Sequence, residues 1–281
     1  MGLPRKLSYE PKVLSDKIVR DSLEAMSIVG LSEPIFLVGG FGVQSYISAE
    51  YFRPTSDLDY AIVKPLTYLD FRKTIKVAVE FLSDKGYSVS LEKGSRAYAL
   101  LVNSTENDNA MKEVQRYTET FFVELARNNE NSFKEKERRL KREFENSVTM
   151  EVDDGLTYRV ARPEDLSLPK VVRALNSLTR NPDFLFLIKR FYSNNSKDVV
   201  KILRKINSFR GEVLRNPGDS YLAEKLRFLS DLYDVRMLVK NIREPFSFDQ
   251  DYFNERSKDW YSFQSSPFHN KRKILNLVGL G

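Results

Sequence analysis

Short apolar runs and amphipathic stretches alternate along the first half of the chain. Residues 13–29 repeat apolar side chains at helical spacing after Ser15, which predicts an amphipathic helix with that serine as its cap. Ile35 to Val38 form a continuous apolar run before a pair of glycines, which predicts a buried strand followed by a turn. Residues 41–50 then predict a short helix.

The same kind of pattern continues as far as residue 162. Alternating polar and apolar positions predict a strand over residues 57–63, and the helical periodicity of 66–85 ends at Gly86, a residue suited to a helix C-terminus. Two hairpins and one further strand are predicted over residues 87–91 with 97–102, 148–152 with 156–161, and 120–126. The charge-rich stretch 133–145 is either a helix or a mobile loop.

The pattern changes at Pro163, after which nearly every segment has helical periodicity. Helices are predicted over residues 163–179, 183–193, 197–214, 219–242 and 252–261. The sequence therefore predicts an α+β fold. A mixed β-sheet core with flanking helices occupies residues 1–162, with the helix at 13–29 packed on it, and a helical domain occupies residues 163–281.

Composition restricts the chemistry. The 281 residues include no cysteine, and His269 is the only histidine. Disulfides, thiolate nucleophiles, Cys-ligated zinc and multi-histidine sites are excluded, so any metal must be held by oxygen, and we expect His269 to be a surface or packing residue. No uncharged apolar run approaches the roughly 20 residues that span a bilayer, and the N-terminus lacks the apolar stretch of a signal peptide. We expect a cytoplasmic protein with no membrane partner.

The net charge of +6 is unevenly distributed. Residues 1–127 contain 16 Lys+Arg and 17 Asp+Glu, whereas residues 128–281 contain 29 and 22 and are therefore net +7. A basic second half is expected if it faces a polyanion. The alternative is a charge-rich surface of the thermophile type.

Two acids on one predicted strand are the strongest indication of chemistry. Side chains alternate faces along a strand, so Asp57 and Asp59 project from the same side. Their mutual repulsion is most easily tolerated if divalent cations offset it. Mg²⁺ is the natural choice, because it prefers oxygen ligands and is commonly held by one or two carboxylates together with substrate phosphates.

The glycine pair supplies the complementary feature. Without side chains, the backbone of Gly39 and Gly40 can approach a triphosphate closely, and the helix that follows offers N–H groups at its start. A glycine pair and a D-x-D motif, in this order and spacing, indicate a site for a metal and a nucleotide.

The combined pattern, G-G followed by R-x-T-x-D-x-D from Arg53 to Asp59, resembles the nucleotidyltransferase superfamily with a DNA polymerase β-like core. It is particularly similar to the minimal branch related to AbiEii toxins of toxin–antitoxin systems. The resemblance implies a third acid on a neighbouring strand, and Glu124 has the required apolar neighbours.

A more distant similarity extends the resemblance to roughly residues 31–205, although it is strong only over 38–59. The segment P-E-D-L that follows Arg162, with Lys170 and then the Lys197-Asp198 pair, is similar to a segment of the same branch.

This resemblance implies two-metal nucleotidyl transfer. Asp57 and Asp59 would bind two Mg²⁺ ions, with Mn²⁺ as an alternative, and Glu124 would complete the metal site or accept the proton of the attacking hydroxyl. Lys170 would be a catalytic contact for the nucleotide phosphates. The nucleotide-binding residues implied in the same way are Gly39, Gly40, Arg53, Thr55, Ser56 and Asp198.

Each of these assignments competes with a purely structural role. Glu124 could instead pair with Arg116 or Arg127 on an exposed strand face. Arg53 and Thr55 could simply order the turn before the strand, Lys170 could be a surface lysine, and Asp198 could be a helix-start acid.

The implied reaction moves NMP from an NTP to an acceptor. A tRNA or other RNA 3′ end is favoured by the basic half, a protein hydroxyl is a further candidate, and the AbiEii branch implies a toxin with an antitoxin partner. The competing hypotheses are an inactive RNA-binding or partner-binding protein on the same fold, and transfer to a small molecule.

Overall fold

The computed structural model describes residues 11–94, 97–106, 116–126, 129–152, 155–192, 198–216 and 218–281. These residues form two compact units. We call residues 11–45 and 54–162 the sheet unit, and residues 46–53 and 163–281 the helical unit.

The sheet unit is built on one mixed seven-stranded sheet in the order β3-β4-β5-β2-β1-β7-β6. The strands are β1 Ile35–Leu37, β2 Asp57–Ile62, β3 Ser88–Lys93, β4 Ala97–Glu106, β5 Arg116–Ala126, β6 Val148–Val152 and β7 Leu156–Val160. The pairs β2–β5 and β1–β7 are parallel, and the other neighbours are antiparallel. The α+β class and both predicted hairpins, β3–β4 and β6–β7, are confirmed.

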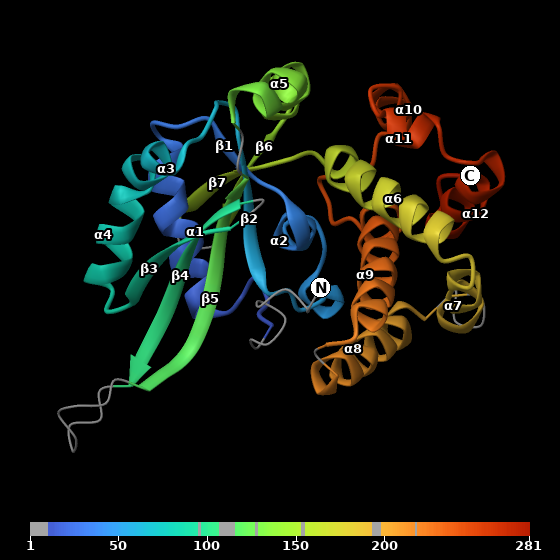
Figure 1. Ribbon diagram of the computed structural model, residues 1–281, viewed down its shortest axis with the longest axis horizontal. Helices are drawn as coiled ribbons and strands as arrows, with labels where there is room; N and C mark the ends of the chain where they lie inside the picture. The colour runs from blue at the N-terminus through green and yellow to red at the C-terminus, as the bar shows by residue number, and fades with distance from the viewer. Residues whose placement is uncertain are drawn as a thin grey trace. The chain divides into compact units, whose positions relative to one another are not determined.

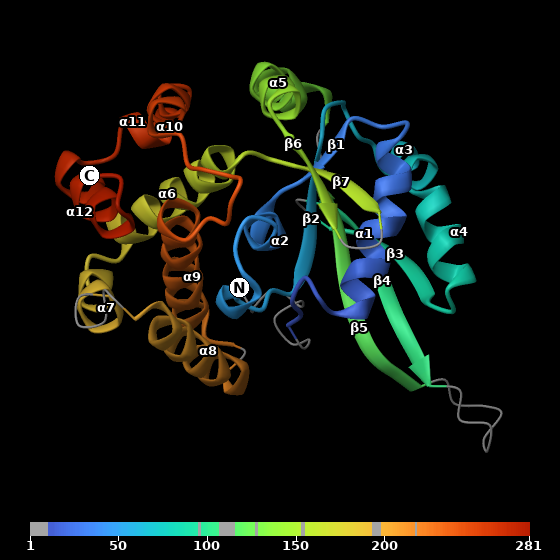
Figure 2. The same cartoon turned by 180° about the vertical axis from the view of Figure 1, so that it is seen from behind.

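In the described part of the sheet unit, the helices are α1 Lys17–Gly30, α2 Gly39–Gln44, α3 Tyr68–Thr74, α4 Lys76–Asp84 and α5 Glu130–Glu145. Helix α1 packs on the sheet and on α4, and Figures 1 and 2 show α2 on the other side of the strands from α1. The apolar side of α1, including Val19, Leu23 and Val29, is completely buried, as its periodicity predicts. The chain therefore forms a layered core in which β2 and β5 are central strands.

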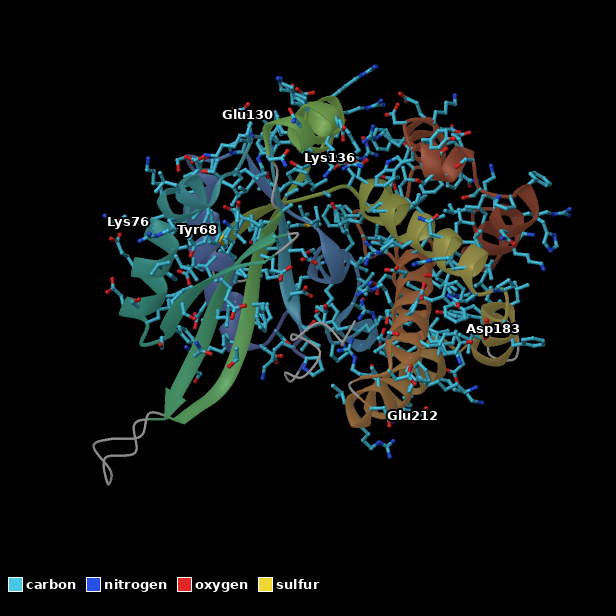
Figure 3. All side chains as sticks on the ribbon, viewed as in Figure 1. Tyr68, Lys76, Glu130, Lys136, Asp183 and Glu212 are labelled. Atoms are coloured by element: carbon cyan, nitrogen blue, oxygen red, sulfur yellow. The ribbon has the colours of Figure 1, made fainter. Side chains whose placement is uncertain are left out.

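Local details of these helices differ from the sequence prediction. Helix α1 begins after Asp16 rather than Ser15, and the Asp16 carboxylate accepts a hydrogen bond from the N–H of Val13 at 2.8 Å. The helix predicted over 66–85 is two helices, because the fully buried Ile75 leaves helical geometry, with φ −93° and ψ 2°. The charge-rich stretch is a helix, α5, on which Figure 3 labels Glu130 and Lys136.

The helical unit contains α6 Pro163–Arg180, α7 Phe184–Phe191, α8 Val199–Arg215, α9 Ser220–Lys240, α10 Gln250–Ser257, α11 Tyr261–Gln264 and α12 Phe268–Val278. Helix α9 is its centre, because it packs against α6, α7, α8 and α12 and is buried at almost every position from Phe228 to Leu238. The single last helix predicted over 252–261 is replaced by α10 and α11, and α12 was not predicted. Among the described residues, no helix has both the length and the apolar character needed to cross a membrane.

Residues 46–53 belong to the helical unit although they precede β2 in sequence. The prediction of a helix over 41–50 is therefore only partly right: α2 ends at Gln44, and a short 3₁₀ helix, η2 Ala49–Tyr51, follows. The backbone of Ile47 pairs with that of Ile242, and the Tyr233 hydroxyl donates to the carbonyl of Tyr51 at 2.9 Å.

Candidate metal site and its surroundings

Three carboxylates meet on the two central parallel strands of the sheet unit. The register of β2 and β5 sets Asp59 directly beside Glu124, and Asp57 is two residues earlier on β2. All three side chains are partly buried, and one oxygen atom from each lies within 4.8 Å of the other two. The structure therefore brings together the three acids that the sequence and its resemblance indicated.

This donor set suits a hard divalent cation. Two oxygens bound to one Mg²⁺ at about 2.0–2.1 Å can be at most about 4.2 Å apart. The three carboxylates are thus close to the spacing of a shared ion, and a small side-chain rotation would complete it. Because like charges held this close repel one another, binding of a cation would be favourable here.

The glycine pair lies against the acidic strand. Gly39 has φ +71°, a conformation that L side chains rarely adopt, and a Cβ atom placed on it would be 2.3 Å from the Oδ2 atom of Asp59. A Cβ atom on Gly40 would be 3.0 Å from Oγ1 of Thr55. Since the Val38 N–H also donates to the Asp59 carbonyl at 2.8 Å, the start of α2 is fixed beside the acids. Only glycine allows this approach at position 39.

Thr55 and Ser56 form the turn that leads into the acidic strand. Thr55 is buried, and its backbone exchanges two hydrogen bonds with Lys12, at 2.7 and 2.9 Å. The Ser56 hydroxyl donates to Oδ1 of Asp57 at 3.4 Å. Thr55 therefore has the turn-ordering position that the sequence left open, while Ser56 contacts one of the three carboxylates.

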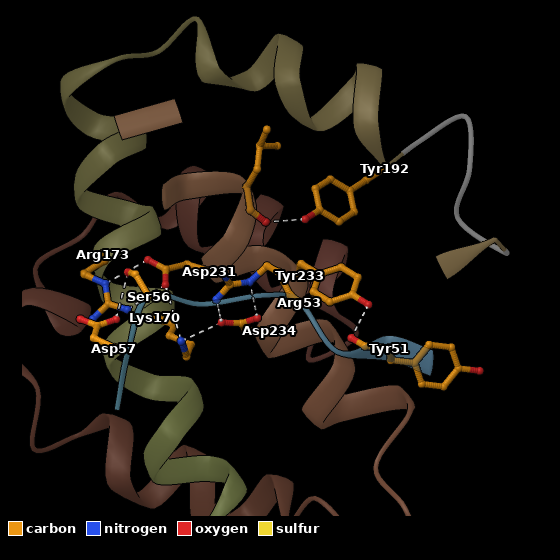
Figure 4. A network of polar contacts seen from close by, with 11 residues as sticks. Tyr51, Arg53, Ser56, Asp57, Lys170, Arg173, Tyr192, Asp231, Tyr233 and Asp234 are labelled. Carbon is orange, nitrogen blue, oxygen red and sulfur yellow. Dashed lines mark hydrogen bonds and ion pairs between the residues drawn. The ribbon is translucent and has the colours of Figure 1, made fainter. Parts of the chain in front are cut away.

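Arg53 and Lys170 both contact a residue that the sequence analysis did not single out (Figure 4). Arg53 donates to both carboxylate oxygens of Asp234 on α9, at 3.0 and 2.8 Å, and the Lys170 ammonium is 2.8 Å from Oδ2 of the same residue. All three side chains are buried. Burial by itself would raise the pKa of Asp234, but the charges and hydrogen bonds of Arg53 and Lys170 outweigh it and lower the pKa to about 2.

A second acid on α9 extends this cluster. Asp231 accepts two hydrogen bonds from Arg173, at 3.0 and 2.7 Å, and lies 3.8 Å from the Lys170 ammonium. Asp231 and Asp234 were missed by the sequence analysis. A signal was available, because two acids three positions apart lie in a mostly apolar stretch of α9, and acids buried in such a stretch need cationic partners.

Lys170 and Asp198, which the more distant part of the resemblance assigned to the nucleotide site, both make contacts within the helical unit. Lys170 is 4% exposed and is therefore not a surface lysine. Asp198 is exposed and caps α8 by accepting a hydrogen bond from the Lys201 N–H at 2.9 Å, which is the helix-start role. Lys197 and Arg127 lie outside the described residues, and His269 is exposed.

The similarity to known proteins is distant. No family model and no curated protein matches the sequence. Among solved structures, the chain is similar to an antigenic nucleotidyltransferase-like protein from Paracoccidioides brasiliensis, with 13% sequence identity over 78% of this chain and 95% of that chain, at a TM-score of 0.39. A similarity this distant is too weak to establish an activity, which has to be judged from the residues of the site.

Proposed function

We propose that this protein is a divalent-metal-dependent nucleotidyltransferase that moves NMP from an NTP to an acceptor hydroxyl. The observation that carries the proposal is the convergence of Asp57, Asp59 and Glu124 beside the backbone of Gly39. An oxygen-only cluster next to a close backbone approach suits a triphosphate with its Mg²⁺, and the absence of cysteine and the single histidine leave few other catalytic groups.

In the proposed reaction, the acceptor oxygen attacks the α-phosphorus of the NTP, the bond from that phosphorus to the bridging oxygen breaks, and pyrophosphate leaves. When bound, Mg²⁺ or Mn²⁺ would neutralise triphosphate charge and lower the pKa of the attacking hydroxyl. Asp57 and Asp59 would hold two such ions. Glu124 would complete the metal site or accept the hydroxyl proton, since it is the third carboxylate of the group.

Binding of the triphosphate would depend on the segments on either side of the acids. The Gly39 and Gly40 backbone offers the close approach, and Ser56 is placed beside Asp57. We assign Arg53 and Lys170 a positioning role: through their shared contact with Asp234 they would order the segment of chain that precedes β2.

An RNA 3′ end, such as that of tRNA, is the acceptor that we propose, because residues 128–281 are net +7 and a basic surface favours a polyanion. The resemblance to the AbiEii branch extends the proposal to a toxin that is controlled by an antitoxin. Transfer of NMP to a protein or a small molecule would use the same three acids. The identity of the labelled product distinguishes it from transfer to RNA.

The test is incubation of the protein with each α-³²P-labelled NTP, Mg²⁺ and total RNA, with separate analysis of RNA, protein and small-molecule fractions. We expect label in RNA from the wild-type protein and none from Asp57→Asn. Glu151→Gln, which replaces an exposed acid on β6, is the matched control and should transfer normally. RNA that binds to the protein without any transfer of label would instead support an inactive RNA-binding protein on this fold.

A further inference from the structure

The short helices near the C-terminus carry two large aromatic side chains that the helical unit leaves in solvent. Tyr261, the first residue of α11, is 83% exposed, and Phe268, the first residue of α12, is 77% exposed. These are the two most exposed aromatic side chains among the described residues. Rings exposed to this extent add almost nothing to the apolar core of the helical unit, so their faces are accessible to a partner.

The packing of α11 and α12 does not depend on these two rings. Phe263 is buried and lies edge-to-face against Phe253, with ring centroids 6.4 Å apart. Ile274 and Val278 are fully buried, and α12 packs on α6 and α9 (Figure 1). The apolar contacts that hold these helices are therefore supplied by other residues, and Tyr261 and Phe268 are free to serve a different purpose.

The same segment is basic and has no acid of its own. From Trp260 to Gly281 the chain contains three cations, Lys271, Arg272 and Lys273, and no Asp or Glu. The Lys271 ammonium donates to the Gln264 carbonyl at 3.1 Å, so this cation of α12 is held against the end of α11. The nearest preceding acid is Asp259, whose carboxylate is paired with Arg256 at 2.6 Å.

We propose that Tyr261, Phe268 and the cations Lys271 to Lys273 form a docking surface for single-stranded RNA. Aromatic rings stack on unpaired bases whatever the sequence, and nearby cations neutralise the backbone. Between the two rings, the Gln264 side-chain amide donates to the Ser257 carbonyl at 3.0 Å and the Ser265 hydroxyl donates to the Tyr261 carbonyl at 2.9 Å. The exposed Ser262 hydroxyl is suited to a hydrogen bond with a base. This inference deepens the acceptor part of the proposed function and rests on it for its biological purpose, although binding itself is measured separately from transfer.

Two other occupants fit less well. A second copy of the chain would bring the same acid-free, cationic segment against itself, which like charge disfavours. An anionic membrane would satisfy the cations, but insertion of the rings would also require burial of the polar residues between them. Unpaired RNA meets both the charge and the stacking requirement.

The first test measures fluorescence anisotropy of a 5′-fluorescein-labelled 20-nucleotide single-stranded RNA of mixed sequence. Because stacking on an aromatic side chain contributes substantially to each base bound, we expect the Tyr261→Ala/Phe268→Ala protein to bind about 10-fold more weakly or worse. Phe186→Ala removes a ring that is 72% exposed on α7 and is the matched control, which should bind as the wild type does. Circular dichroism melting verifies that all three proteins are equally folded.

A second measurement separates stacking from charge. The logarithm of the binding constant falls with the logarithm of salt concentration by about 0.7 for each phosphate of a single strand that is neutralised. Arg272→Gln/Lys273→Gln should therefore reduce the magnitude of that slope by about 1.4, whereas Tyr261→Ala/Phe268→Ala should leave it nearly unchanged.

Several outcomes would overturn the inference. The RNA affinity of the Tyr261→Ala/Phe268→Ala protein could equal that of the wild type, Phe186→Ala could lose as much affinity as the double variant, or the wild type could bind the duplex form of the same RNA equally well. The protein could also bind phosphatidylserine vesicles and not RNA. Finally, light scattering could show that the wild type is a dimer and the double variant a monomer. Asp57→Asn should still bind the RNA. If Asp57→Asn binds RNA but the wild type transfers no label, the proposed enzyme activity is wrong and the RNA-binding surface stands. If the wild type transfers label to RNA but the Tyr261→Ala/Phe268→Ala protein binds RNA normally, the surface is wrong and the enzyme activity stands.

Discussion

Asp59 and Glu124 lie side by side on parallel strands, although two helices and a hairpin separate them in sequence. With Asp57, they place three carboxylate oxygens within 4.8 Å of one another. Three carboxylates held this close repel one another, and the repulsion has a measurable consequence for stability and for the binding of a cation.

Neutralising one of these acids should therefore weaken metal binding without lowering the stability of the metal-free protein. At about 4.8 Å, two charges near a protein surface interact by about 1 to 3 kcal/mol, depending on solvent access. We expect Glu124→Gln in EDTA to be at least as stable as the wild type, and to bind Mn²⁺ about 10-fold more weakly or worse. Urea unfolding and Mn²⁺ electron paramagnetic resonance measure the two effects. Glu151→Gln should change neither, and a Glu124→Gln protein with undiminished Mn²⁺ affinity would remove Glu124 from the site.

Gly39→Ala should damage the metal site, whereas Gly86→Ala should not. Both glycines have positive φ, 71° and 88°, so the backbone conformation alone should cost each variant about 1 kcal/mol of stability. Only at position 39 would the new Cβ meet Asp59 Oδ2, at 2.3 Å, since nothing lies within 4 Å of the equivalent atom at position 86. Chemical denaturation of both variants measures the loss of stability, and titration with Mn²⁺ measures whether the contact with Asp59 also weakens metal binding. Equal Mn²⁺ affinity in both variants would contradict this interpretation.

Asp234→Asn should destabilise the helical unit strongly at neutral pH. The substitution leaves the buried charges of Arg53 and Lys170 without their carboxylate, and breaking a buried pair in this way typically costs about 3–5 kcal/mol. Chemical denaturation at pH 7 measures the loss. Asp251→Asn, at an exposed position on α10, is the control and should be nearly neutral.

The same carboxylate predicts how stability depends on acid. The pKa of Asp234 is about 2 in the folded protein, because Arg53 and Lys170 overcome the opposing effect of burial, and it is about 3.9 in an unfolded chain. A lowered folded pKa contributes stability that is present above about pH 4 and lost as the pH falls to about 2, here about 2 kcal/mol. The wild type should therefore lose more stability than Asp234→Asn between pH 4 and pH 2, and parallel pH profiles would contradict this.

Asp198 should behave as a helix cap. Its side chain accepts the hydrogen bond of the Lys201 N–H, so Asp198→Ala should cost about 1 kcal/mol of stability, whereas Asp198→Asn should retain most of it, because asparagine caps equally well. Thermal unfolding of the two variants measures this difference. A large fall in NTP affinity in Asp198→Asn, with stability retained, would return this residue to the nucleotide site that the family resemblance implied.

The sequence by itself was sufficient wherever the determining pattern is local. Alternation over residues 57–62 and the apolar run before Gly39 identify the two strands and the turn, since side-chain direction in a strand depends only on position along the chain. Apolar neighbours likewise placed Glu124 on a strand. The ends of helices were less predictable, and α12 was overlooked although Pro267 precedes it and Gly279, with φ 95°, ends it.

Tertiary structure decided which charges are paired. Nothing local to Arg53 or Lys170 indicates that both contact Asp234, because that contact exists only when η2 and α6 pack beside α9. The same is true of residues 46–53, which join the helical unit through contacts with Ile242 and Tyr233. Burying a charge is costly without a partner, and the partner is selected by packing between segments distant in sequence. The acidic strand was therefore predictable from its own residues, whereas the ion pairs of the segment that precedes it were not.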